Sequence, residues 1–152
     1  VNMQKENFSV HGAVTLVLQR KDGECIASRH NNMVLNSGID FLCNAFGAGS
    51  ARPNVMNHIA GGTGTTVVAA GDTTLANELL RKAASYSHSA GTTKLTVQTT
   101  FNAGEATGPI TEAGICNASS GGIFFDRVTF PVINKGASDV LTVTFEITLT
   151  RA

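Results

Sequence analysis

The carboxyl-terminal segment carries the most regular pattern of apolar and polar residues in the chain. Between residues 141 and 150 every second side chain is large and apolar, and the side chains between them are threonine or glutamate. The apolar positions are Leu141, Val143, Phe145, Ile147 and Leu149. A strict period of two predicts a strand with one face in the core and the other in water.

A similar alternation near the amino terminus predicts a β-hairpin. The apolar or small residues on one side of residues 9–19 are Val10, Gly12, Val14, Leu16 and Leu18. Asp22-Gly23 follows, and residues 24–30 can return as the partner strand. An Asp-Gly pair is typical of two-residue hairpin turns, in which both central residues have positive φ.

The apolar period then changes from two to that of a helix. Apolar residues follow one another at i, i+3, i+4 and i+7, at Ile39, Leu42, Cys43 and Phe46. Asn36 or Ser37 can cap the start of this helix, and Gly47 or Gly49 can end it. We expect the apolar stripe to cover one end of a β core.

A second, shorter helix is predicted after a glycine-rich loop. The loop spans residues 61–72, and Asp72 can cap a helix of one or two turns within residues 73–82. Leu75 and Leu79 would point inward, with Leu80 as a further candidate.

Four more segments are typical of strands, namely residues 55–60, 93–101, 108–117 and 122–132. A turn of small residues separates the last two, and residues 133–139 form another turn. The chain therefore predicts seven or eight strands and two short helices. The expected fold class is mainly β, an antiparallel β-sandwich, of jelly-roll type in one version.

Residues 9–152 are expected to form this sandwich as a single domain, since 152 residues suffice for one core. The residues before them are polar and unpatterned and predict an amino-terminal arm. As a candidate contact with a partner, the arm comprises Val1, Asn2, Met3, Gln4, Lys5, Glu6, Asn7 and Phe8. The sequence shows no pattern of a signal peptide or of a membrane-spanning segment.

The low charge narrows the choice of function. Charged residues make up 14% of the chain, against about 25% in typical domains, and the formal net charge is zero. A nucleic-acid-binding protein usually carries a basic excess, so no nucleic-acid partner is expected. A net charge near zero favours association with copies or partners.

The residue types that could bind metals or phosphates lack the required spacing. Cys25, Cys43 and Cys116 lie far apart and are interpreted as small buried apolar residues. The four histidines fall in separate segments without the local spacing of a metal site. The Gly61–Thr66 loop lacks the lysine of a phosphate-binding loop and does not open directly into a helix. No cofactor or metal is predicted.

The densest charged groups are interpreted as structural ion pairs. Glu78 and Arg81 would pair at i, i+3 on the second helix, and Glu112 and Arg127 would pair across neighbouring strands. Paired carboxylates can perform acid–base chemistry, but no nucleophile with a positioned base accompanies these. The chain is therefore not expected to be an enzyme.

From about Arg29 onward, several segments resemble a family of small structural proteins encoded by tailed bacteriophages. The most distinctive are the GTGTT loop followed by DTTLANEL, and the stretch GEATGPITEAGICNASSGG. The other segments, in part overlapping these, are HNNMVLNSGIDFLCNAF, HIAGGTGTT, DTTLANELLRKA, TFNAGEATGPITEAGICNASSGGIFFDRVTF and INKGASDVLTVTFEITLT. The similarity covers about four-fifths of the chain. No catalytic motif belongs to this family.

The resemblance implies a virion structural protein on the exterior of the capsid, assembled in the host cytoplasm. The leading interpretation is a capsid decoration (cement) protein that binds the outer surface of the major capsid protein shell and stabilises the head. Its partners would be the major capsid protein and copies of itself, as a dimer or trimer, without nucleic acid or membrane. The alternative is a tail, baseplate or fibre accessory or receptor-binding module.

Overall fold

The structure is a computed structural model that describes residues 6–151 and contains nine strands and one helix. The elements are β1 (Phe8–Gln19), β2 (Cys25–Val34), α1 (Asn36–Gly47), β3 (His58–Gly62), β4 (Glu78–Ala83), β5 (Ser85–His88), β6 (Lys94–Phe101), β7 (Gly108–Cys116), β8 (Asp126–Lys135) and β9 (Val140–Arg151). None of its described helices is both long and apolar enough to span a membrane.

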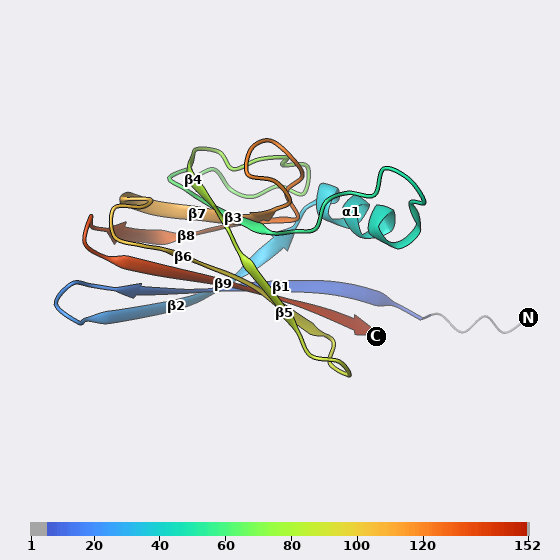
Figure 1. Ribbon diagram of the computed structural model, residues 1–152, viewed down its shortest axis with the longest axis horizontal. Coiled ribbons are helices and arrows are strands. Elements are labelled where there is room, and N and C mark those ends of the chain that lie inside the picture. Colours follow the sequence, from blue (N-terminus) through green and yellow to red (C-terminus); the bar gives the residue numbers. More distant parts are fainter. Residues whose placement is uncertain (1–5, 152) are drawn as a thin grey trace, which may run out of the picture.

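All nine strands belong to one antiparallel sheet in the order β4-β3-β7-β8-β2-β1-β9-β6-β5. The sheet has two halves, the β7 half (β4, β3, β7, β8) and the β1 half (β2, β1, β9, β6, β5), which lie over one another in Figure 1. β2 and β8 join the halves through only two residue pairs, Met33 with Arg127 and Val34 with Asp126. β4 and β5 are the two edge strands of the sheet, and only Ala84 separates them along the chain. The two edges therefore lie close together, and the sheet curls into a nearly closed barrel.

The main core lies between the two halves of the sheet. Leu16 of β1 and Phe145 of β9 come from the β1 half, while Ile115 of β7 and Val128 of β8 come from the β7 half. All four side chains are buried. The alternation along the strands thus places one face of each half in this core.

The opposite face of the β7 half is covered as well. The segment 63–77 between β3 and β4 packs on it, with Leu75 buried beside Ala60, Cys116 and Phe124. β3, most of β7 and the first part of β8 are therefore enclosed on both sides. The outer face of the β1 half has no such cover, and Thr100 and Thr142 pair across it at 3.2 Å between their Oγ1 atoms.

The predicted hairpin and the predicted final strand are confirmed. β1 pairs with β2 from Gly12–Asn32 to Gln19–Cys25, and four of the five apolar positions of β9 are fully buried. The turn is one residue longer than predicted. Arg20 and Glu24 close a three-residue loop in which Gly23 has a φ of 93°, so only Gly23 uses the left-handed region.

Helix α1 has the predicted bounds but a different buried face. Ile39 is 46% exposed and Phe46 is 93% exposed, whereas Phe41 and Leu42 pack against the core. Gly38 explains the rotation, because a Cβ at this position would overlap the backbone carbonyl of Phe125. The helix backbone therefore lies directly on the chain that enters β8, and the neighbouring Phe41 and Leu42 face inward.

The prediction of a second helix is wrong. Residues 73–77 have no regular structure, and residues 78–83 form β4. The N–H groups of Ala76 and Asn77 donate to the Glu112 side chain instead of to helical carbonyls. Leu75 is buried as predicted, but Leu79 is 44% exposed.

The remaining strands occur close to their predicted positions. β6 matches the prediction almost residue for residue, while β3 and β8 begin a few residues later than predicted. β4 and β5 were not predicted, and they bring the number of described strands to nine. The described chain is thus mainly antiparallel β with one helix.

Candidate functional site

The predicted ion pair between Glu112 and Arg127 lies on the covered outer face of the β7 half. Arg127 donates through Nε and Nη2 to Glu112 Oε2, at 3.0 and 2.8 Å. Glu112 is 0% exposed and Arg127 is 2% exposed. The cross-strand pairing expected for these residues is therefore confirmed, and both charges are withdrawn from water.

Glu112 also receives three backbone hydrogen bonds from the segment 63–77. The N–H groups of Gly64 and Asn77 donate to Oε1 at 2.9 and 2.7 Å, and that of Ala76 donates to Oε2 at 3.0 Å. Burial alone would raise the pKa of Glu112, but these donors and Arg127 outweigh it, so its pKa lies below the ordinary value. The carboxylate is thus held ionised and is a poor proton acceptor.

Arg127 completes the attachment of this segment. Its Nη1 donates to Asp72 Oδ2 at 2.7 Å, and its Nη2 donates to the carbonyl of Thr66 at 3.0 Å. The N–H of Ala69 and the Arg127 guanidinium lower the pKa of Asp72. The cluster of Glu112, Arg127 and Asp72 therefore fastens the glycine-rich loop, and the Gly64 N–H is not available to a phosphate.

The second predicted ion pair, Glu78 with Arg81, forms on β4 and not on a helix. Arg81 Nε and Nη2 bind the two Glu78 oxygens at 2.9 and 2.7 Å. Arg81 Nη1 also donates to the carbonyls of Ala118 and Gly121, and its guanidinium lies 4.9 Å from the Phe124 ring centroid. Arg81 thus holds the turn between β7 and β8.

A buried pair that the sequence did not indicate lies where the two halves of the sheet meet. Asp126 of β8 accepts a hydrogen bond from the Asn32 amide of β2 and another, at 2.8 Å, from the N–H of Ile115. Burial raises the pKa of Asp126 to about 8, although both donors oppose the shift. Asp126 is therefore largely protonated at neutral pH.

Asn32 Oδ1 is buried without a hydrogen-bond donor. Turning the Asn32 amide over would place this oxygen opposite the protonated Asp126, whose hydroxyl can donate to it. With Asp126 protonated, a neutral acid–amide pair links β2 to β8 without a charge.

The cysteines and histidines do not form a site. Cys25 and Cys43 are exposed, which corrects their interpretation as buried residues, while Cys116 is buried and its pKa is raised to about 11 by burial. Within residues 6–151, no three His, Cys, Asp or Glu side chains group together as ligands for a metal ion.

Most of the predicted arm lies outside the described residues. Val1–Lys5 are not described, Glu6 and Asn7 precede the first strand, and Phe8 is the first residue of β1. Phe8 is 67% exposed.

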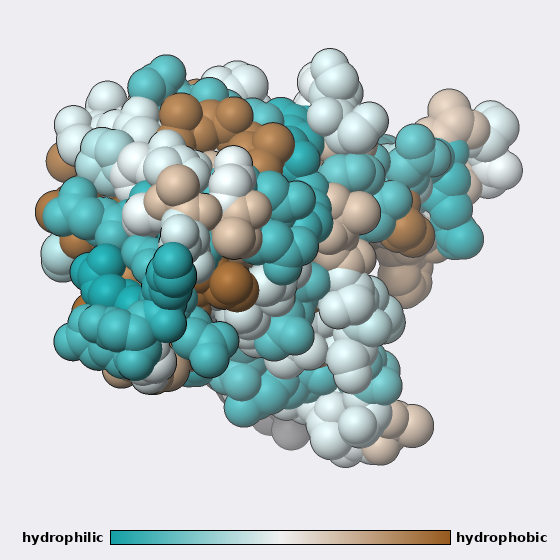
Figure 2. Space-filling view, turned by 60° about the vertical axis from the view of Figure 1, so that its left-hand side comes forward, coloured by the Kyte–Doolittle hydropathy of each residue, from teal (hydrophilic) through white to brown (hydrophobic). Residues whose placement is uncertain are grey.

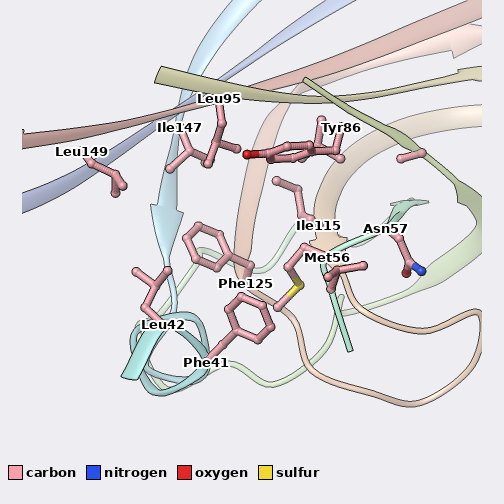
Figure 3. A pocket seen from close by; sticks show the side chains of 13 residues that line it. Phe41, Leu42, Met56, Asn57, Tyr86, Leu95, Ile115, Phe125, Ile147 and Leu149 are labelled. Carbon is pink, nitrogen blue, oxygen red and sulfur yellow. The ribbon is translucent and has the colours of Figure 1, made fainter. Parts of the chain in front are cut away.

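An apolar pocket of about 400 Å³ lies at the α1 end of the barrel. Its walls come from α1, the residues before β3, Ala84 with β5, strands β6, β7 and β9, and Phe125 just before β8. The lining residues are Phe41, Leu42, Val55, Met56, Asn57, Ala84, Tyr86, Leu95, Val97, Ile115, Phe125, Ile147 and Leu149. Figure 3 shows the Tyr86 ring across the cavity from Phe41 and Phe125.

The pocket is open, and apolar groups continue around its mouth. Val55 is 70% exposed, Tyr86 is 61% exposed, and Phe46 on the bordering helix is 93% exposed. None of the lining residues is charged. On the face seen in Figure 2, by contrast, hydrophilic residues predominate and the hydrophobic ones form small separate patches.

Sequence reasoning missed this pocket because its walls come from seven separate segments. The one local signal was Phe41, a large apolar residue beside the predicted helical stripe and not in it. A residue of that kind indicates a second apolar surface, but it does not identify the partner strands.

Comparisons with known protein families, with curated proteins and with solved structures gave no match. The family resemblance of the motifs therefore stays a prediction.

Proposed function

We propose that this chain is a virion structural protein, a capsid decoration (cement) protein that binds the outer surface of the major capsid protein shell of a tailed phage. It acts there as a homo-oligomer and stabilises the head through contacts, without catalysing a reaction. A jelly-roll-like sandwich, which recurs in such modules, is part of the same proposal.

The observation that carries a binding role is the division between buried charge and exposed apolar surface. The carboxylates of Glu112 and Asp72 serve the fold, because they are occupied by Arg127 and by backbone N–H groups. The exposed apolar side chains Val55 and Tyr86 line an uncharged pocket, and Phe46 is exposed on α1, the helix that borders it. Such a surface favours contact with another macromolecule.

The choice of the shell as partner is supported by the motif resemblance and by the charge. A formal net charge of zero weakens repulsion between neighbouring copies on a lattice. Many copies on a symmetric shell can combine modest contacts into strong overall attachment. A small domain without an active site is sufficient for such a role.

The proposal is tested by adding the purified chain to heads assembled without it and sedimenting the mixture. We expect saturable binding at a fixed ratio to the major capsid protein, together with a higher temperature of head disruption. Purified tails serve as the parallel sample. Binding to tails and not to heads would contradict the proposal and favour the tail, baseplate or fibre alternative.

A further inference from the structure

Strand β5 has an open edge beside the apolar pocket. It is the last strand in the order of the sheet, and within residues 6–151 it pairs only with β6, from Ser85–Gln98 to His88–Leu95. All four of its residues are exposed, and none is Lys, Asp, Glu or Pro. Those residues commonly protect an edge strand from pairing with another chain. The shortness of β5 is the one such protection it has.

The open edge is continuous with the pocket because the strand changes partners at Ala84. The Ala84 N–H donates to the carbonyl of Asn57 at 2.8 Å, so this part of the chain still contacts the segment leading into β3. Beyond Ala84 the chain pairs with β6. In Figure 3, Tyr86 lies on one side of the cavity, while Met56 and Asn57 lie on another.

The pocket can receive side chains from a strand placed along this edge. Alternate side chains of a strand project to the same face and are about 7 Å apart. A cavity of about 400 Å³ lined by Leu, Ile, Phe, Met and Val has room for more than one large apolar side chain. Tyr86, which belongs to β5 and lines the pocket, connects the edge to the cavity.

We propose that β5 and the pocket form a docking site for an extended segment of a partner protein. The segment adds to the open edge of β5 as a further strand and inserts large, uncharged side chains from alternate positions into the pocket. The identification of the partner as a shell subunit rests on the proposed function. The docking mode rests on the edge and the pocket alone.

An extended peptide can pair with the open edge of β5 and also fill the pocket, whereas a small molecule or a helix can do only one of these. A small apolar molecule or a docked helix could fill the cavity, but neither would pair with the N–H and C=O groups of β5. Strand addition gains affinity from backbone hydrogen bonds and specificity from pockets for alternate side chains. The absence of charged residues from the lining selects an uncharged, apolar inner face.

A displayed library of random twelve-residue peptides, selected on the full chain, tests the proposal. We expect enriched peptides to carry large apolar residues at alternate positions. An enriched peptide would then be resynthesised in two forms, one N-methylated at its odd-numbered backbone nitrogens and the other at its even-numbered ones. These two forms are the two registers of methylation. One of the two registers should lose at least tenfold in affinity, because methylation removes the donors that face β5.

Matched substitutions locate the site. Val55→Asp places a charge at the mouth of the pocket, and Val67→Asp places one at an equally exposed valine of the 63–77 segment, outside the pocket. Both valines are exposed, at 70% and 83%, so neither change should unfold the chain. We expect Val55→Asp to weaken peptide binding at least tenfold and Val67→Asp to leave it unchanged.

Three results would overturn the docking mode. They are selection of no peptide or of peptides with helical spacing, equal binding of both N-methylated registers, and equal effects of the two aspartates. Self-association that Val55→Asp abolishes and Val67→Asp preserves would replace the partner by a second copy. Because the peptide assay uses no phage particle, its failure leaves head binding untouched, and failure of head binding leaves the peptide result standing.

Discussion

At the residue scale, Glu112 and Arg127 show how a chain with little charge uses the charge it has. Both are buried on the covered face of the β7 half, where they hold the segment 63–77 through backbone groups and Asp72. A buried ion pair is costly to break, because the remaining partner stays uncompensated. The pair therefore determines where the segment lies.

Replacing Glu112 with Gln should destabilise the fold strongly. Arg127 would lose its fully buried counter-charge and keep only the partly exposed Asp72. Removal of one partner of a buried pair typically costs about 3–5 kcal/mol. Urea unfolding measures the loss, and amide hydrogen exchange should accelerate at Gly64, Ala76 and Asn77. Glu105→Gln is the control, since its partner Lys82 is partly exposed and the pair should matter little. Equal stability of E112Q and the unmodified chain would show that the network does not fasten the segment.

Asp126 should give the stability an opposite dependence on pH from that of an ordinary carboxylate. Its pKa is raised from 3.8 to about 8, so between these values the folded chain binds more protons than the unfolded chain. The contribution of Asp126 to the free energy of unfolding is therefore retained below about pH 4 and falls as the pH rises to about 8. The slope is at most about 1.4 kcal/mol per pH unit.

Asp126→Asn isolates this effect, because Asn resembles the neutral acid and can donate to Asn32. Urea unfolding of both chains from pH 5 to pH 8 should show D126N gaining stability relative to the unmodified chain. A stability difference between the two chains that stays constant from pH 5 to pH 8 would mean that Asp126 is ionised in the folded chain throughout this range.

At the element scale, the segment 63–77 depends on close packing at Gly64. A Cβ there would lie 2.6 Å from the Ala76 Cβ and 2.8 Å from the Glu112 Cδ, and these groups are held by the network. Gly64→Ala should therefore cost about 1–3 kcal/mol, measured by thermal unfolding. At Gly71 a Cβ would meet nothing within 4 Å, so Gly71→Ala should leave stability unchanged or slightly higher. Equal melting temperatures for the two variants would contradict the packing at Gly64.

The elements differ in how well the sequence predicts them. β9 and the β1–β2 hairpin follow from local alternation, because each has one face in the core and one in water. The leucine spacing after Asp72 is compatible with a helix, and for this reason a helix was expected there. The helix does not form because the Asn77 N–H donates instead to Glu112, which lies 35 positions away in the sequence. Local periodicity carries no information about such a distant acceptor.

The face of α1 was mispredicted for a related reason. The apolar stripe gives a face centred on Leu42 and Cys43, but close contact at Gly38 with Phe125 turns Phe41 and Leu42 inward. The ion pairs were predictable as pairs, since opposite charges on neighbouring strands tend to meet. The Asp126–Asn32 pair and the pocket were not, because both depend on how the sheet closes.

At the scale of the whole molecule, the two halves of the sheet differ in how much of their outer surface is covered. The segment 63–77 covers the outer face of β3 and β7, whereas the outer face of the β1 half carries paired threonines that are only partly buried. The α1 end offers the apolar pocket and the exposed Phe46, Val55 and Tyr86. The molecule thus presents a polar sheet face and an apolar end as possible contact surfaces, with its charged network inside.

The location of the chain in purified phage particles tests the central claim most directly. Electron cryo-microscopy of whole particles, with the chain labelled by a small fused tag, distinguishes heads from tails. If the chain is a capsid decoration protein, its density is regularly spaced over the outer surface of the head lattice, in register with the major capsid protein. Labelled density confined to the tail or baseplate, with none on the head, would contradict it.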